Sequence, residues 1–196
     1  MSKKHPIHDG DVITLWTIQD VPAFEKMQEM GVMEVHDDRF IEPNFVTAYN
    51  WLKNKMIEHG VTPSNTSQTY PVWAWYKYDG KRRVDLRSSH GEKGAHLVRI
   101  EFDVPREDVL LSDFCLWHSV LNNCYIGDTE QEEEYYWDNE SLFSREDVEK
   151  SWEKIFDIEE IKKNLYLCNP ELQSIQATMW KIDMNQVRNV KYFTSR

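Results

Sequence analysis

One short segment near the middle of the chain concentrates the residue types that catalysis at neutral pH requires. Residues 110–122 include Asp113, Trp117, His118 and Asn122. Because imidazole titrates near neutral pH, His118 is a candidate general acid or base, and Asp113 is a candidate to orient a substrate hydroxyl. The alternative is a half-buried helix histidine that hydrogen-bonds to a backbone carbonyl.

A helix is expected to position these side chains. The preceding hydrophobic strand runs into Ser112, a good helix N-cap, and Asp113 then lies in the first turn, where a carboxylate favours the helix dipole. Helical spacing places on one continuous face Phe114, Trp117, His118 and Leu121. This face is apolar apart from one imidazole, which indicates a site at a strand-to-helix junction rather than plain core.

A basic cluster at residues 81–87 is dense for an acidic protein. Arg83 and Arg87, with Asp85 between them, form a candidate fork for a phosphate or a carboxylate, because guanidinium groups pair bidentately with such anions. The alternative is a solvated loop whose charges offset nearby acids.

Aromatic side chains gather in the predicted strand 70–76, where Trp73 and Trp75 alternate with the other residues. Indole rings stack on a base or a nicotinamide ring, although tryptophans in one strand are also common in a core. In the helix predicted over residues 45–59, Tyr49 and Trp51 lie on different faces, so only one of them can line a cleft.

The hydrophobic pattern predicts one α+β domain over residues 1–196. Strands are expected at 12–19, 70–76, 96–104, 175–182 and 187–193, and helices at 23–30, 45–59, after Ser112, and after a capping box at 144–147. Asp20 and Gly31 are expected to bound the first helix. Residues 1–10 are expected to be a frayed tail, and residues 126–143 an exposed acidic loop.

Composition disfavours several classes of protein, although a local basic groove stays possible. The chain of 196 residues has a net charge of −11, which disfavours a general nucleic-acid binder or a binder of anionic membranes. It has seven glycines and no phosphate-binding loop motif, and no metal motif is present. The three cysteines lack metal-type spacing, which predicts reduced thiols. The sequence also shows no apolar leader and no long apolar segment, which predicts a cytoplasmic protein.

Five segments together resemble the bacterial family catalogued as domain of unknown function 3841. They are residues 15–19 (LWTIQ), 70–75 (YPVWAW), 85–87 (DLR), 110–122 (LLSDF through WHSVLN) and 175–182 (IQATMWKI). The resemblance covers nearly the whole chain, and the Asp-Phe-x-x-Trp-His pattern is its most specific part. The family implies no activity.

The order of elements is also similar, more distantly, to the ADP-ribosyltransferase fold, especially its DNA-modifying toxin branch. That resemblance implies a mostly antiparallel split sheet flanked by helices, with NAD as a substrate. In that fold the first strand carries a His or Arg that holds NAD, and a late strand opens with a Glu that holds the ribose. The matching positions are Thr17 and Gln176. Gln176 can bond a ribose hydroxyl, but it brings no charge to a developing cation, a loss worth several kcal/mol at low effective dielectric.

Two functions follow as hypotheses. The first is a transferase that acts on NAD or a related nucleotide, with no firmly implied cofactor. Its catalytic residues would be Gln176, His118 and Asp113, and its binding residues Thr17, Gln19, Tyr49, Trp73, Trp75, Arg83, Asp85, Arg87, Trp117 and Asn122. The second is a non-catalytic module whose acidic residues 128–140 bind a basic protein partner.

Overall fold

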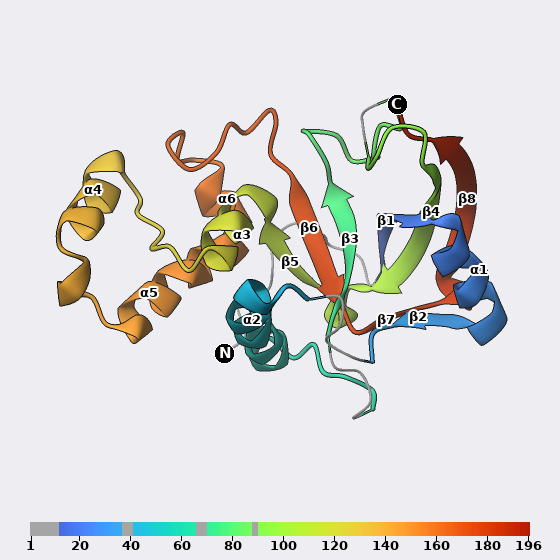
Figure 1. Ribbon diagram of the computed structural model, residues 1–196, viewed down its shortest axis with the longest axis horizontal. Coiled ribbons are helices and arrows are strands. Elements are labelled where there is room, and N and C mark those ends of the chain that lie inside the picture. The colour runs from blue at the N-terminus through green and yellow to red at the C-terminus, as the bar shows by residue number, and fades with distance from the viewer. Residues whose placement is uncertain (1–11, 37–40, 66–69, 88–89) are drawn as a thin grey trace.

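The computed structural model describes residues 12–36, 41–65, 70–87 and 90–196 (Figure 1). The predicted frayed tail of residues 1–10 lies outside the described residues. The described part of the chain contains a six-stranded antiparallel sheet, a two-stranded sheet and six α-helices, which confirms the predicted α+β fold. None of the helices in these described ranges is long and apolar enough to span a lipid bilayer.

The large sheet has the strand order β5-β6-β3-β1-β4-β8, and all neighbouring strands are antiparallel. Its strands are β1 (Val12–Asp20), β3 (Val72–Lys77), β4 (His96–Pro105), β5 (Leu110–Asp113), β6 (Ile175–Met179) and β8 (Val187–Thr194). Two short strands, β2 (Val32–Glu34) and β7 (Lys181–Asp183), pair separately. The strands predicted at 12–19, 70–76, 96–104 and 187–193 are thus confirmed to within two residues at each end.

The middle of the large sheet is narrow. Strands β1 and β3 share a single registered pair, Trp16 with Trp75, whereas β1 pairs with β4 along its whole length. Beyond the Trp16–Trp75 pair, the hydroxyl of Thr17 donates a hydrogen bond of 3.1 Å to the backbone carbonyl of Trp73. The sheet therefore consists of two three-stranded halves, β5-β6-β3 and β1-β4-β8, that meet over a short distance.

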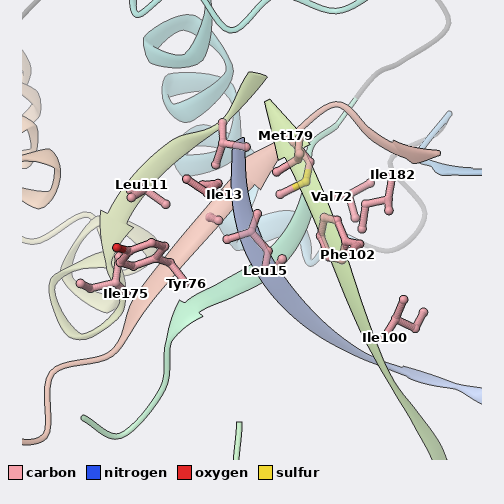
Figure 2. Close-up of a cluster of buried hydrophobic side chains, with 14 of the residues drawn as sticks. Ile13, Leu15, Val72, Tyr76, Ile100, Phe102, Leu111, Ile175, Met179 and Ile182 are labelled. Carbon is pink, nitrogen blue, oxygen red and sulfur yellow. The ribbon is translucent and has the colours of Figure 1, made fainter. Parts of the chain in front are cut away.

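One face of the large sheet carries the first hydrophobic core (Figure 2). Successive side chains of a strand alternate between faces, so every second residue of β1, β3 and β4 points into this core. The clearest members are Ile13 and Leu15 of β1 and Phe102 of β4, all at most 1% exposed. Tyr76 of β3 also belongs to this core, as Figure 2 shows.

Helix α1 (Val21–Met30) covers part of this core and begins and ends where the sequence predicts. The Asp20 side chain accepts a hydrogen bond of 2.7 Å from the Ala23 amide, and Gly31 has a φ of 75°. Glycine adopts this left-handed conformation without a Cβ penalty, so the chain can leave the helix here and enter β2.

The opposite face of the sheet is covered near β5 by a second hydrophobic core. It is built by α2 (Val46–Glu58), α3 (Phe114–Leu121), α5 (Arg145–Trp152), α6 (Ile158–Ile161) and the 3-10 segment Glu153–Phe156. Trp51 of α2 stacks on Phe156 at 5.7 Å. Ser144 and Asp147 form the predicted capping box at the start of α5. Further 3-10 segments are Pro43–Phe45, Arg106–Asp108, Glu140–Leu142 and Met184–Gln186.

The predicted acidic loop over residues 126–143 was wrong, because this segment contains helix α4 (Glu130–Asp138). The Thr129 side chain caps the helix, and the carboxylates of Glu132 and Glu133 accept hydrogen bonds from the amides of residues 128 and 127. Carboxylates at a helix N-terminus also interact favourably with the helix dipole. The acidic run therefore stabilises a helix, and the predicted exposure holds for most of its side chains.

The predicted strand over residues 175–182 was also wrong in one respect, because it is interrupted at Trp180. Strand β6 ends at Met179, and the following β7 pairs with β2 in the small sheet. Trp180 turns into the second core, where its indole donates a hydrogen bond of 3.0 Å to the carbonyl of Val61. Burial of this large ring, rather than strand propensity, decides the local backbone path.

Candidate functional site

Helix α3 is capped by Asp113 and not by Ser112. The Asp113 carboxylate accepts hydrogen bonds from the amides of Cys115 at 2.9 Å and Leu116 at 3.1 Å, and from the side-chain amide of Gln173 at 3.0 Å. The predicted cap was wrong by one residue, because a carboxylate with two acceptor oxygens satisfies several donors while Ser112 continues strand β5. Burial raises the pKa of Asp113, and its hydrogen bonds oppose the rise.

The buried side of α3 consists of Leu116, Trp117 and Val120, whereas His118 is exposed. The single predicted face that grouped His118 with the apolar residues was therefore wrong. The helix is rotated because Leu116 and Val120 fill the second core.

His118 nevertheless keeps one ring nitrogen for chemistry. Its Nδ1 atom lies 2.9 Å from the carbonyl oxygen of Phe114, which can only accept, so Nδ1 carries the proton of the neutral ring. Its Nε2 atom then holds a lone pair, as a general base requires. Asn122 ends the helix by donating a hydrogen bond of 2.7 Å to the His118 carbonyl.

Three neighbouring strands bring Ser112, Gln176 and Trp75 side by side. Gln176 of β6 pairs with Ser112 of β5 on one side and with Trp75 of β3 on the other. Directly paired residues of antiparallel strands share a face, and this face is the one opposite the first core.

Ser112 and Gln176 carry buried polar atoms that the described residues do not satisfy. Ser112 is 0% exposed and Gln176 is 4% exposed. Neither the Ser112 hydroxyl nor the side-chain nitrogen of Gln176 has a hydrogen-bond partner among the described residues. Because an unsatisfied buried polar group costs about 1–3 kcal/mol, a hydrogen-bond partner at either atom would stabilise the fold.

Trp75 is the centre of a row of rings that we name the aromatic arc. The arc consists, in order of contact, of His118, Phe114, Trp75, Tyr78 and His90. Successive ring centroids are separated by 4.7, 4.8, 4.7 and 5.7 Å. Its three middle rings are half-buried, so they leave aromatic surface beside the unpaired donor of Gln176. Partly exposed rings beside a few polar groups are typical of sites for planar ligands.

Trp73 and Tyr49 belong to a different aromatic group, which packs between β3 and helices α2 and α3. The ring centroid of Tyr49 lies 6.0 Å from that of Trp73 and 5.7 Å from that of Trp117. The ring centroids of the two tryptophans are 5.2 Å apart. Burial raises the pKa of the Tyr49 hydroxyl. Of the two candidate stacking tryptophans, Trp73 thus packs against the second core, and Trp75 lies in the aromatic arc.

The structure does not bring the two arginines of the candidate anion fork together. Arg87 binds Asp85 with its Nε atom at 3.0 Å and its Nη2 atom at 2.7 Å, and it holds the pKa of that carboxyl well below its usual range. The Nη2 atom of Arg83 lies 3.7 Å from the Oε2 atom of Glu101 on strand β4. A phosphate would have to replace Asp85 at Arg87, so this cluster is a closed ion pair rather than a preformed anion site.

Thr17 and Gln19 lie on the other face of the sheet from Gln176. They pair with Ile100 and Val98, and they therefore share the face of the first core. The Gln19 amide donates to the Thr17 hydroxyl at 2.8 Å, and Thr17 donates to the Trp73 carbonyl. Thr17 therefore bridges the narrow junction between β1 and β3, and Gln19 supports its hydroxyl from within β1.

Sequence reasoning missed four members of this site. They are Tyr78 and His90 of the aromatic arc, Ser112 as an unpaired polar residue, and Gln173, which binds Asp113. Strand alternation was a usable signal for Trp75, whereas Gln176 was named only from the position that the resemblance to ADP-ribosyltransferases implies. Tyr78 and His90 join the arc through the turn and loop after β3, whose course the sequence pattern does not determine.

Neither a metal-ligand cluster nor an activated thiol is present among the described residues. Within the described ranges, no cluster of three His, Cys, Asp or Glu side chains is arranged to hold a metal ion. The cysteines are free thiols, as predicted, and burial raises the pKa of Cys115, Cys124 and Cys168, the last to about 11. A raised thiol pKa lowers the fraction of reactive thiolate.

One protein family matches a part of the chain that includes most of the elements that build the site. The family described as Domain of unknown function (DUF3841) matches residues 14–142. The chain belongs to this family. The DUF3841 match includes the whole aromatic arc, and Gln176 lies beyond it. Comparisons with curated proteins and with solved structures gave no match, so they offer no support for the more distant resemblance to ADP-ribosyltransferases.

Proposed function

We propose that the protein is a transferase of the ADP-ribosyltransferase type that binds NAD or a related nucleotide at the aromatic arc. The observation that carries the proposal is the side-chain nitrogen of Gln176, which is buried, lacks a partner among the described residues and lies in register with Trp75. A free hydrogen-bond donor beside aromatic surface suits a ligand that combines a planar ring with polar groups, as nucleotides do.

Each side chain then has a separate role. The planar ring of the nucleotide stacks in the arc at Trp75, where indole offers the largest aromatic surface. Gln176 donates to a ribose hydroxyl oxygen, which fixes the sugar relative to the stacked ring. Because this donor is neutral, it positions the sugar without stabilising positive charge, so we expect slow turnover compared with an enzyme that has a carboxylate there.

His118 supplies the proton acceptor. In the proposed transfer, the bond between the ribose C1 atom and the nicotinamide nitrogen breaks, and nicotinamide leaves as a neutral molecule. An acceptor hydroxyl or water forms the new bond to C1, and its proton passes to Nε2 of His118. The hydrogen bond from Nδ1 to the Phe114 carbonyl holds the ring in the required tautomer.

The rate of nicotinamide release from NAD, measured by chromatography, tests this proposal. We expect His118→Ala and Gln176→Leu each to lower the rate by about 10²-fold or more, since positioned acid–base groups contribute 10²–10⁴-fold. Asn189→Ala is the matched control, because Asn189 belongs to the same register row but lies exposed on β8. Equal rates in wild type and both variants, or no release at all, would contradict the proposal.

A second candidate function, a protein-binding module, is favoured by the surface of α4. Tyr135 and Trp137 are 58% and 56% exposed on this helix, beside carboxylates such as Glu134 and Asp138. Carboxylates interspersed with exposed aromatic rings suit a basic protein partner, because aromatic residues anchor interfaces and charge directs the encounter.

A charge reversal at Glu134 and Asp138 tests this module. These two residues are exposed, whereas Glu132 and Glu133 cap α4 and their replacement would disturb the helix. We expect Glu134→Lys with Asp138→Lys to abolish binding of a lysine-rich amphipathic peptide, measured by fluorescence anisotropy. The matched control is Glu25→Lys on α1. Unchanged binding in the double variant would remove this candidate.

A further inference from the structure

Strand β8 ends the large sheet without a neighbour on its outer side. It is the last strand in the order β5-β6-β3-β1-β4-β8, and no described strand pairs with its free edge. The register with β4 is regular from Asn189 to Thr194, and it shifts on the β8 side near Val187. Six residues of regular backbone therefore direct every second N–H and C=O group outward, as an edge strand does.

The free edge is basic in an otherwise acidic protein. Residues 184–196 contain Arg188, Lys191 and Arg196 and no acidic residue, although the whole chain carries 34 acidic and 23 basic side chains. Arg188 is paired with Asp103. Lys191 is exposed and forms no ion pair with any described residue, so its charge is available at the edge.

A cavity of about 560 Å³ adjoins the end of the same edge. Its lining is mostly apolar and consists of Val21, His96, Leu97, Tyr192, Phe193 and Thr194. Tyr192 is 56% exposed there. Such a cavity suits one apolar side chain of a neighbouring segment, since pockets for alternate side chains give specificity when a strand is added to a sheet edge.

We propose that β8 binds an extended acidic segment of a partner protein by strand addition. The outward backbone groups supply the hydrogen bonds, Lys191 pairs with an acidic side chain directly opposite, and an apolar residue next along the segment enters the cavity beside Tyr192. Adjacent residues of the added strand point to opposite faces, so the segment alternates acidic and apolar residues. A second copy of this chain fits less well, because pairing two β8 strands would bring their cationic side chains together.

The experiment titrates the full chain with a heptapeptide of alternating Glu and Val whose two ends are blocked. Binding is measured from the changes in backbone amide chemical shifts in nuclear magnetic resonance spectra of the protein. Two peptides serve as controls: one with Lys in place of Glu, and one with alternate backbone nitrogens methylated. We expect the Glu peptide to shift amides of residues 189–194 and to bind about tenfold more tightly than the Lys peptide. Methylation should abolish binding, because it removes the donors that strand addition uses.

Two protein variants complete the test. Lys191→Glu should reverse the preference between the two charged peptides, whereas Lys150→Glu, an exposed lysine on α5, should leave it unchanged. Equal binding of both charged peptides, retained binding after methylation, or no shifts in residues 189–194 would overturn the proposal. A dimer in sedimentation that Lys191→Glu strengthens would overturn it in favour of pairing between two copies.

Discussion

At the scale of one residue, the proposed function depends most on Gln176. Its side chain is 4% exposed, yet its nitrogen has no partner among the described residues. The next residue on the same face of β6, Thr178, is 0% exposed and its hydroxyl donates to the Leu110 carbonyl at 3.2 Å. The contrast between two equally buried positions is what we attribute to a ligand-binding role.

Replacing the unpaired amide should therefore stabilise the fold. We expect Gln176→Leu to raise the free energy of unfolding by about 1–2 kcal/mol, because it removes an unsatisfied buried donor at similar volume. Thr178→Val should lower that free energy by about 1 kcal/mol, since it breaks a formed hydrogen bond. Urea denaturation measures both values, and a destabilised Gln176→Leu variant would show that the amide has a structural partner.

The buried carboxyl group of Asp113 leads to a prediction about how stability depends on pH. Burial raises the pKa of Asp113 in the folded state, so its contribution to stability is greatest below its unfolded pKa and is lost as pH rises through the folded pKa. Asp113→Asn removes this titration. Its side-chain oxygen can still cap α3, and the Gln173 amide, whose oxygen is unpaired among the described residues, can rotate to accept from the new nitrogen.

We therefore expect the variant Asp113→Asn to gain stability relative to wild type as pH rises from 4 to 7. Urea denaturation of both proteins at the two pH values gives the comparison. A difference in free energy that is constant with pH would show that the carboxyl group titrates alike in the folded and unfolded states.

At the scale of elements, the turn after β3 positions the start of β6. The Gly80 amide donates to the Gln173 carbonyl at 3.2 Å, and the Asp79 amide donates to the Ser174 hydroxyl at 2.9 Å. Gly80 has a φ of +75°, and a Cβ atom there would lie 1.8 Å from the Glu171 carbonyl oxygen. Only glycine allows this close approach, which fixes the segment leading directly into Gln176.

Gly80→Ala should therefore cost more than an ordinary glycine replacement. We expect a loss of more than about 2 kcal/mol in the free energy of unfolding, from left-handed backbone strain and the clash together. Gly94→Ala separates the two causes, because Gly94 has a φ of +87° but nothing within 4 Å of its added Cβ, so about 1 kcal/mol is expected. Equal losses measured by urea denaturation would show that the close approach does not matter.

Local signals predicted the elements well where one residue decides them. Asp20 and Gly31 bound α1, and Ser144 with Asp147 begins α5, because caps act within a few residues. Helix α4 was missed since its charge pattern resembles a loop. The break at Trp180 was missed because burial in a distant core causes it.

The candidate site was predictable only in part, for a related reason. Trp75 could be named from the sequence because it lies in a strand with a clear pattern, and Gln176 was named from the position that the resemblance to ADP-ribosyltransferases implies. Their pairing with each other and with Ser112 depends on register between distant strands, and Tyr78 and His90 reach the arc through an irregular loop. The prediction of a single domain over residues 1–196 stays a prediction.

At the scale of the whole molecule, the two candidate protein-binding surfaces lie far apart along the long axis. Figure 1 shows the acidic helix α4 at one end of the long axis and the edge strand β8 together with α1 at the other, with β3 and β6 between them. The aromatic arc centres on β3, and the ring of His90 at its end lies 5.9 Å from the ring of Phe193 on β8.

Calorimetric titration of the purified full chain with NAD, ADP-ribose and ATP tests the central claim that the arc with Gln176 binds a nucleotide. We predict saturable binding of NAD or ADP-ribose that Gln176→Leu abolishes and Asn189→Ala preserves. A melting temperature that rises by several degrees with saturating ligand should accompany it, because a ligand that binds only the folded state stabilises that state. No saturable binding of any of the three, or binding that Gln176→Leu leaves unchanged, would contradict the claim.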